Sequence, residues 1–309
     1  MASTRKTLTL YDDYHAMMAD PVRLLAYRAA IESVVKAGDV VIDLGAGLGI
    51  LSFLALRAGA SRVYAIEKGD SITLARQVAE RNGFSSRMEF IPHNSKDVTL
   101  PERADVLVSE TLGSFAVEEN TLDFTIDARN RLLKPNARMI PQGLRLFLAP
   151  VQASHEAKKS DFWRDVIGFD YTPARDECVS RMSLARFNTR SLLATPQIYS
   201  DINLATAHSA SLDQRLLFKI HKKGTIHGLA GWFQARLTEE IIIDTSPSKP
   251  STHWQQAFFP FRESIKVMRD DFLEVVMHVN PESSHSDNSS IQYTYRCSQR
   301  HGNSGGQGS

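Results

Sequence analysis

The chain has 309 residues, 42% hydrophobic and 23% charged, which is enough for one large globular domain or two smaller ones. Its 36 basic and 35 acidic residues give a formal net charge of +1, which argues against a polyelectrolyte nucleic-acid binder. The chain has only two cysteines and no metal-ligand spacing, so we expect neither a disulfide framework nor a metal site. It has no run of 18 apolar residues and no apolar signal region, so we expect a cytoplasmic protein without a membrane span.

The N-terminal region, residues 1–35, is predicted to carry a helix with a clear start signal. Asp20 is a good N-cap residue, and Pro21 follows it at the first helical position, where its missing N–H has no cost. Helical spacing of apolar residues continues after the proline. The residues before this helix form a polar arm with two tyrosines, Tyr11 and Tyr14.

The next region, residues 36–145, alternates short apolar runs with helical segments. Such alternation with short connections is typical of a parallel, doubly wound sheet of the Rossmann-like kind. We expect strands at 40–42, 63–66, 88–91 and 106–108, and helices at 50–58, 71–82 and 121–133.

From residue 146 to residue 300 the apolar residues fall into period two, which is typical of antiparallel strands. One such series is formed by Leu273, Val275, Met277 and Val279. We expect a β-barrel domain in this region, interrupted by a polar, helix-like arm at about 155–190. The Gly/Ser-rich tail at 301–309 is predicted to be disordered.

A glycine-rich turn follows the first predicted strand. Gly45, Gly47 and Gly49 alternate there, and glycine is needed where backbone approaches a ligand or takes a positive φ. This spacing differs from the G-x-G-x-x-G of dinucleotide sites, and Asp43 precedes it, which suits a cationic ligand without phosphates. Glu67 closes the second strand, where a carboxylate can accept both hydroxyls of a ribose. The constellation resembles class I S-adenosylmethionine (SAM)-dependent methyltransferases.

Two glutamates flank the loop after the fourth predicted strand. Glu110 follows that strand directly, at the sheet edge where open α/β sheets bind ligands. Glu119 lies nine residues later, across a turn at Gly113. We expect these two carboxylates to face each other over the loop, and we expect the neighbouring Glu118 to point to solvent.

Four motifs, covering roughly residues 11 to 297, resemble the protein arginine methyltransferase family. The Ser-Glu, glycine and second glutamate within 109–119 match its double-E loop, and Thr252-His253-Trp254 matches its THW loop. The stretch from Met17 to Arg23 resembles its lid helix. The stretch 162–170 resembles the segment that opens its dimerisation arm. The resemblance implies SAM as cofactor and a homodimer.

The resemblance also implies roles for the matching residues. The catalytic residues would be Glu110, Glu119, His253 and Asp20. The substrate would be bound by the two glutamates together with Trp254 and Tyr14. The cofactor would be held by Arg23, Asp43, Gly45, Gly47, Glu67 and Met17. Since a guanidinium is a delocalised cation and a poor nucleophile, two carboxylates would localise its charge and orient one nitrogen. The proton would pass either to a glutamate or to the His253–Asp20 pair, and the sequence leaves this choice open.

Some positions depart from the family's pattern and leave two further points open. Lys96 stands where many members carry a glutamate for the adenine amino group, so the adenine contacts around 95–97 stay open. The loop after Glu110 resembles that of the symmetric dimethylating branch, whereas His253 and Met17 resemble the asymmetric branch. The product type is therefore open as well.

We expect a SAM-dependent N-methyltransferase for the guanidino group of arginine in a protein or peptide. Because the chain carries only the catalytic core, methylation of free L-arginine or another small guanidino compound is a second hypothesis. A third is an inactive binding partner of another methyltransferase, which the two glutamates and Arg23 argue against. Apolar residues of the arm, among them Phe162 and Ile167, are expected to pack against a second subunit.

Overall fold

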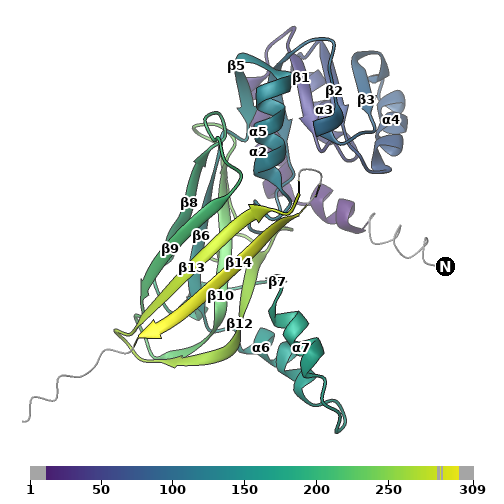
Figure 1. Ribbon diagram of the computed structural model, residues 1–309. Helices are drawn as coiled ribbons and strands as arrows, with labels where there is room; N and C mark the ends of the chain where they lie inside the picture. The colour runs from purple at the N-terminus through teal and green to yellow at the C-terminus, as the bar shows by residue number, and fades with distance from the viewer. Residues whose placement is uncertain (1–11, 284–285, 287, 299–309) are drawn as a thin grey trace, which may run out of the picture.

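The computed structural model describes residues 12–283, 286 and 288–298, and it shows two sheet domains, one above the other in Figure 1, with a projecting helical arm. Tyr11 and the expected tail at 301–309 lie outside the described residues. No helix in the described part of the chain has the length and apolar character needed to cross a membrane.

The N-terminal helical region packs on the first sheet domain. Helix α2 (Pro21–Val34) begins at Asp20, whose carboxylate accepts the backbone N–H groups of Val22 (2.9 Å) and Arg23 (3.2 Å). A capping carboxylate of this kind satisfies N–H groups that have no partner inside the helix. The predicted helix start is confirmed, and it places Arg23 in the first turn.

The first domain is a five-stranded parallel sheet with helices between its strands. Its strands are β1 (Val40–Leu44), β2 (Arg62–Ile66), β3 (Met88–Ile91), β4 (Ala104–Ser109) and β5 (Leu133–Ile140). Its helices are α3 (Ile50–Ala58), α4 (Ser71–Arg81) and α5 (Thr121–Leu132), with two short 3-10 turns, η1 (Ser85–Arg87) and η2 (Ser95–Asp97). The order β3-β2-β1-β4-β5 reverses between β1 and β4, which makes their carboxyl ends the expected ligand position. The Rossmann-like domain is confirmed.

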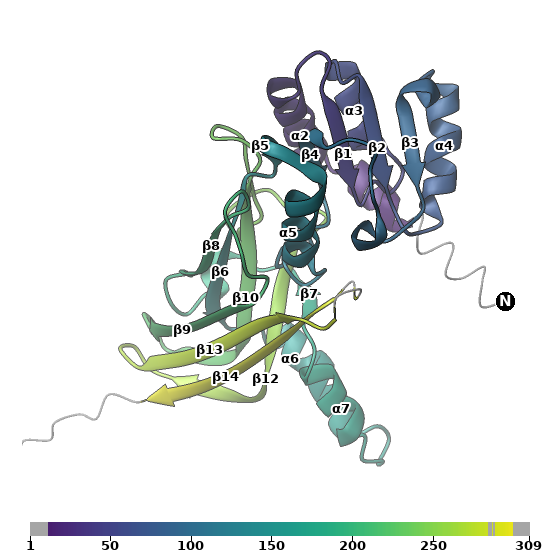
Figure 2. The same ribbon diagram turned by 45° about the horizontal axis from the view of Figure 1, so that its top comes forward.

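The second domain consists of two antiparallel sheets, and the chain enters it after residues 141–142. The larger sheet has the order β7-β12-β10-β6-β8, with β11 on β10, and the smaller has the order β14-β13-β9. These strands are β6 (Gly143–Val151), β7 (Ser183–Ala185), β8 (Gln197–Asn203), β9 (Leu212–Lys219), β10 (Gly224–Arg236), β11 (Ile242–Asp244), β12 (Gln256–Val267), β13 (Phe272–Pro281) and β14 (Ser289–Ser298). The alternating residues of β13 noted in the sequence are fully buried between the sheets, so the antiparallel domain is confirmed. In Figure 2, α5 lies on the side of the parallel sheet that faces this domain.

Tyrosine side chains join the two antiparallel sheets where strand pairing does not. The Tyr293 hydroxyl donates to the carbonyl of Pro260, and the Tyr295 hydroxyl accepts the N–H of Arg262 (3.1 Å). The Tyr295 ring also stacks on Phe261, with ring centroids 3.6 Å apart. Apart from the isolated bridge between Ala194 and Ile220, backbone pairing in the described part of the chain does not close the two sheets into one barrel. The domain is therefore barrel-like in enclosing a common core, while its ladders stay open.

The arm between β6 and β7 projects away from the parallel-sheet domain in both views (Figures 1 and 2). It consists of α6 (Ser154–Asp161), η3 (Phe162–Arg164) and α7 (Thr172–Val179), and a further 3-10 turn, η4 (Thr189–Ser191), follows β7. Several of its apolar side chains face solvent, with Ile167 91% exposed and Phe169 64% exposed. The expected inserted helical arm is therefore present, and its tip is apolar.

A cluster of ion pairs fixes the base of this arm. Arg175 on α7 donates through Nε to Asp161 (3.1 Å) and through Nη2 to the carbonyl of Arg262 on β12 (2.6 Å). Arg164 contacts the same Asp161 (2.9 Å) and also Glu263 (3.0 Å). Because Arg175 is buried and touches both arm helices and β12, it is the residue that holds the arm against the sheet.

Replacing Arg175 by methionine should lower the free energy of unfolding by about 1.5–3 kcal/mol, the range for hydrogen bonds to charged groups. A matched control in the same arm is Arg181→Met, which removes an exposed pair with Glu177 and should cost less than about 1 kcal/mol. Urea unfolding curves measure both variants. Equal losses in the two would show that Arg175 does not hold the arm.

Candidate active site

Two adjoining cavities lie at the carboxyl ends of β1, β2 and β4, with volumes of about 550 and 210 Å³. Both are lined by Tyr14, Gly45, Glu67, Thr111 and Glu119. The larger cavity extends to residues 93–95, and the smaller one extends to the lid at Met17 and Arg23. This is the position that the strand order predicts for a bound ligand.

The glycine turn forms the floor between the two cavities. Gly45 and Gly47 have φ of 74° and 52°, the left-handed region in which side chains are strained. A Cβ on Gly45 would come 2.5 Å from Cγ2 of Thr111, and one on Gly47 would come 3.0 Å from the Tyr14 ring. The turn thus needs glycine both for its backbone path and for the space that it leaves.

Glu67 lies beside this turn and lines both cavities. Its Oε2 accepts the N–H of Gly47 (3.1 Å), and its Oε1 accepts the N–H of Gly69 (2.6 Å). Each carboxylate oxygen can accept a further hydrogen bond. Glu67 is therefore fixed in orientation by backbone donors, with acceptor capacity left for ligand hydroxyls.

Asp43 lies behind the glycine turn and lines neither cavity, and its expected contact with the cofactor stays a prediction. Its Oδ2 accepts both the N–H (2.9 Å) and the hydroxyl (2.6 Å) of Ser52 in α3, while its Oδ1 has no partner among the described residues. Burial raises the pKa of Asp43 to about 6, against the opposing hydrogen bonds from Ser52. The carboxylate thus anchors the helix that follows the turn. Ser52 was not singled out from the sequence, although it is the one polar residue in the first seven of an apolar helix.

Arg23 and Glu110 form an ion pair on the wall of the smaller cavity. The Arg23 Nε and Nη2 atoms both lie 2.5 Å from Oε2 of Glu110, and the two side chains are only 7% and 4% exposed. Glu110 also accepts the N–H of Leu112 (3.3 Å) through its other oxygen. The sequence leads us to expect Arg23 at the cofactor carboxylate, and the structure adds that the same guanidinium holds one of the two glutamates.

Glu119 is exposed to the cavities, and it lines both of them together with Thr111. Glu110 lines the smaller one, so the structure brings the two glutamates to the same cavity. Glu118 behaves differently from the expectation. Its carboxylate turns back under the loop and accepts the N–H of Phe115 at 2.8 and 3.0 Å, so it does not point to solvent.

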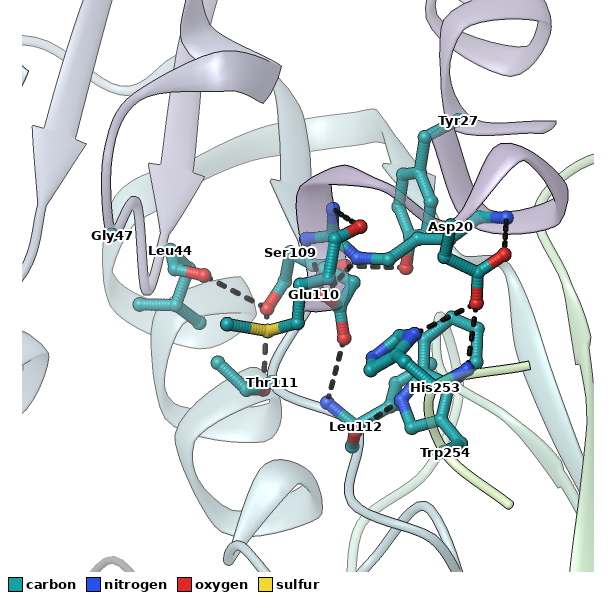
Figure 3. A network of polar contacts seen from close by, with 12 residues as sticks. Asp20, Tyr27, Leu44, Gly47, Ser109, Glu110, Thr111, Leu112, His253 and Trp254 are labelled. Carbon is teal, nitrogen blue, oxygen red and sulfur yellow. Dashed lines mark hydrogen bonds and ion pairs between the residues drawn. The ribbon is translucent and has the colours of Figure 1, made fainter. Parts of the chain in front are cut away.

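The lid and the antiparallel domain meet at Asp20 and His253 (Figure 3). Oδ2 of Asp20 lies 2.9 Å from Nδ1 of His253 and also accepts the backbone N–H of His253 (2.9 Å). Burial raises the pKa of Asp20, but the hydrogen bonds from His253 and Arg23 outweigh it and hold the pKa below its ordinary value. The expected contact is therefore present, and Asp20 is an anion that joins helix α2 to the loop before β12.

Trp254 supports the loop between the two glutamates, and its expected role in substrate binding stays a prediction. The residue is 3% exposed and lines neither cavity. Its Nε1 donates to the carbonyl of Leu112 (2.6 Å), and its own carbonyl accepts the hydroxyl of Ser114. Figure 3 shows the indole reaching Leu112 beneath Glu110. The role of Ser114 was not predicted, because a serine in a loop has no periodic signal.

Tyr14 and Met17 lie on the lid side of the cavities. Tyr14 packs against Gly47, and burial raises the pKa of its hydroxyl although Ser71 at the start of α4 acts to lower it. Tyr14 therefore lies over the glycine turn, next to the expected cofactor position, although the sequence predicts that it binds the substrate. Met17 lines the smaller cavity, and its carbonyl accepts Nη1 of Arg23 (3.4 Å).

The region expected near an adenine ring is held by a lysine rather than by a glutamate. Lys96 forms an ion pair with Asp123 of α5, and its ammonium lies 5.7 Å from the centre of the Phe124 ring. Ser95 is buried beside it and lines the larger cavity together with Phe124. The larger cavity thus has one aromatic wall and one polar wall.

The two cavities together can hold two ligands of different character. Glu67 and the glycine turn suit ribose hydroxyls, and Glu110 with Glu119 suits a cation that has several N–H donors. In the ranges that the structure describes, no group of three or more His, Cys, Asp or Glu side chains is arranged to hold a metal ion.

Comparison with known families agrees with this geometry. The profile of the arginine methyltransferase oligomerization subdomain matches residues 144–299, which is half of the chain. A second profile, ribosomal protein L11 methyltransferase (PrmA), matches residues 28–144. Protein arginine N-methyltransferase 6 of Xenopus laevis is 31% identical, over 83% of this chain and 80% of its own length. Protein arginine N-methyltransferase 1 of Schizosaccharomyces pombe is 29% identical, over 91% of this chain and 86% of its own length.

Solved structures share the fold along nearly the whole chain. Arabidopsis thaliana protein arginine methyltransferase 10 superimposes with a TM-score of 0.77 at 25% identity, covering 94% of this chain and 93% of its own. A chain of the Trypanosoma brucei PRMT1 enzyme–prozyme heterotetrameric complex with AdoHcy gives a TM-score of 0.82 at 22% identity, covering 93% of both chains. With the cavity, the glutamate pair and the oligomerization subdomain in place, the chain belongs to the protein arginine methyltransferase family.

Proposed function

We propose that this protein transfers a methyl group from SAM to a guanidino nitrogen of arginine residues in proteins. The observation that carries the proposal is the placement of Glu110 and Glu119 in one cavity, together with the glycine turn and Glu67. The relatives named above are arginine N-methyltransferases, and the first-domain match is to a methyltransferase profile. Both the site and the family therefore support this activity.

The residues of the glycine turn fit a SAM molecule. The turn has no space for a Cβ at Gly45, and the Glu67 carboxylate on the cavity wall matches the two hydroxyls of a ribose. Arg23 presents a guanidinium to the same cavity, which suits the carboxylate of the methionyl group. SAM supplies an electrophilic methyl group on a sulfonium.

The two glutamates perform the substrate part of the chemistry. A guanidinium has planar N–H donors that match carboxylates, so Glu110 and Glu119 would bind it from two sides and draw its positive charge toward the bound nitrogens. The remaining nitrogen then keeps more electron density. As it attacks, an N–C bond forms, the C–S bond breaks, and one N–H proton leaves for a carboxylate or for the His253–Asp20 pair.

The ion pair between Arg23 and Glu110 fixes the position of one of these carboxylates. Holding both Nε and Nη2 against Oε2 fixes that oxygen, while Oε1 is left with the single backbone donor of Leu112. A buried charge without a partner is costly, and the Arg23 guanidinium supplies that partner to Glu110 in a largely enclosed site. Arg23 thus links the cofactor region to the substrate region.

We also propose a two-fold homodimer formed through the arm. Exposed apolar side chains at its tip, with Ile167 as the most exposed, are unusual for a segment that faces solvent. The residues of the arm fall within the oligomerization subdomain profile. A self-complementary contact of such a patch gives a closed dimer.

Substituting Glu119→Gln should leave SAM binding within about twofold and should lower the single-turnover rate of methyl transfer by about 100-fold or more, because one charge of the clamp is lost while size is kept. The assay uses labelled SAM with an arginine-rich peptide and, in parallel, free L-arginine. The exposed Glu240→Gln serves as control and should match the wild type. Full activity in Glu119→Gln would show that this residue is not part of the clamp. If the wild type methylated free L-arginine but not the peptide, its substrate would be a small molecule.

Substituting Glu67→Ala should weaken SAM binding by about 1.5–3 kcal/mol, or roughly 10- to 150-fold, because charge-assisted hydrogen bonds to the ribose are lost. Isothermal calorimetry measures this, and NAD should show no binding to the wild type. Glu89→Ala, an exposed change on β3, is the control. An unchanged SAM affinity in Glu67→Ala would place the cofactor elsewhere.

Substituting Ile167→Asp should convert the protein from dimer to monomer at micromolar concentration, since a charge at the centre of an apolar contact is not solvated there. Sedimentation velocity distinguishes the two states. Leu217→Asp, on an exposed position of β9 outside the arm, should remain dimeric. A monomeric and fully active wild type would contradict the proposed assembly.

A further inference from the structure

We propose that Glu118 is a positioning residue whose carboxylate holds the loop between Glu110 and Glu119 in shape, so that Glu119 faces the cavity. The inference rests on the proposed function, because it concerns the second carboxylate of the guanidinium clamp. Glu118 itself lines neither cavity, so it acts through the loop and not on the substrate.

The first observation is the set of donors around the Glu118 carboxylate. The N–H of Phe115 lies 2.8 Å from one oxygen and 3.0 Å from the other. The backbone N–H groups of Ser114, Val117 and Glu118 itself also act on this carboxylate and work to lower its pKa. Consecutive backbone N–H groups that converge on one anion form a nest, a loop shape that the anion stabilises. Here the anion belongs to the chain itself.

The second observation is the space that Gly113 leaves. A Cβ at this residue would lie 2.3 Å from Oε1 and 2.4 Å from Cδ of Glu118, so glycine is required for the carboxylate to enter the loop. The Gly113 carbonyl accepts the N–H of Ala116 (2.9 Å), and Ala116 adopts the left-handed φ of 64°. The turn is thus tight, and the Glu118 side chain fills its inner side.

The third observation is that the backbone is held on both sides of Glu119. The carbonyl of Glu118 accepts the N–H of Ser289 at the start of β14 (2.8 Å). On the other side, the amide of the buried Asn120 donates to the carbonyl of Ser286 (3.0 Å). With its neighbours fixed by the nest and by the β13–β14 connection, Glu119 has one backbone position from which its side chain reaches the cavity.

The environment of the Glu118 carboxyl agrees with this enclosed role. Burial raises its pKa, and the backbone N–H groups act against that rise. A glutamate that projected into water would have neither effect. The Glu118 carboxylate therefore stabilises the loop, whereas the neighbouring Glu119 faces the cavity and binds the substrate.

The test compares Glu118→Gln and Glu118→Ala with the exposed control Glu240→Gln. A glutamine keeps one acceptor but turns an amide donor toward the nest, so we expect the single-turnover rate to fall by about 10-fold, and by about 100-fold in the alanine variant. SAM affinity should stay within twofold, because Arg23, the glycine turn and Glu67, which are expected to hold the cofactor, lie outside the segment 111–120. The value of kcat should fall more than KM rises, since the change misplaces Glu119 without removing it.

A second variant reaches the same contact from the opposite side. Gly113→Ala should expel the Glu118 carboxylate and lower the rate as Glu118→Ala does. In the double variant the new methyl group meets no carboxylate, so the second substitution should add little to the first. Effects that multiply fully in the double variant would show that the two residues act independently and would overturn the proposal.

Hydrogen exchange separates this proposal from the activity on which it rests. Amides of the segment 111–120 should exchange faster in Glu118→Gln than in the wild type, with other segments unchanged. A wild type that methylates no arginine would reject the proposed function whatever the exchange shows. Unchanged exchange in 111–120, or full kcat in a folded Glu118→Ala, would overturn the positioning role alone.

Discussion

The hydrogen bond between the Trp254 indole and the Leu112 carbonyl is the constraint on which the site depends. It runs from the antiparallel domain to the loop that follows β4, and the Ser114 hydroxyl returns a second bond to the Trp254 carbonyl. Both bonds are buried, so water does not compete for their donors and acceptors. Two glutamates on a long loop would otherwise sample many positions, and a clamp needs them in one. The second domain therefore holds the loop of the first domain that carries both glutamates.

Charges in this site occur as matched pairs. Arg23 holds Glu110, and His253 contacts Asp20, so the lid helix carries one member of each pair. Such pairing avoids the cost of an isolated buried charge, and it also ties the lid to both sheet domains. Because Asp20 caps α2 while it contacts His253, the start of the helix and the approach of the antiparallel domain are set by the same carboxylate.

The sequence predicted the fold well because its signals were periodic or local. Asp20 and Pro21 marked the start of α2, and the alternating apolar residues of β13 marked a strand with one buried face. The motifs also led to the cavity, since glycines and carboxylates after parallel strands meet at one sheet edge. Side-chain direction within loops has no period, and this is where the expectations failed. Glu118 and Glu119 are the same residue type side by side, and the space at Gly113 together with the N–H of Phe115 accommodates the carboxylate of Glu118 inside the loop. Trp254 and Asp43 were likewise placed in the correct region, but a supporting contact and a ligand contact look alike in sequence.

The closure of the loop has a consequence for how such enzymes diverge and can be redesigned. Thr121 at the start of α5 donates its hydroxyl to the carbonyl of Thr111, so the two ends of the loop are stapled together across the residues between them. An insertion or deletion inside that span would break either the staple or the nest, whereas side chains that face away from both are open to substitution. The number of residues between the two glutamates is therefore constrained by the loop, in addition to the identity of Gly113. Moving this loop into another protein would therefore require two further residues: Trp254, which holds the Leu112 carbonyl, and Thr121, which joins the ends of the loop.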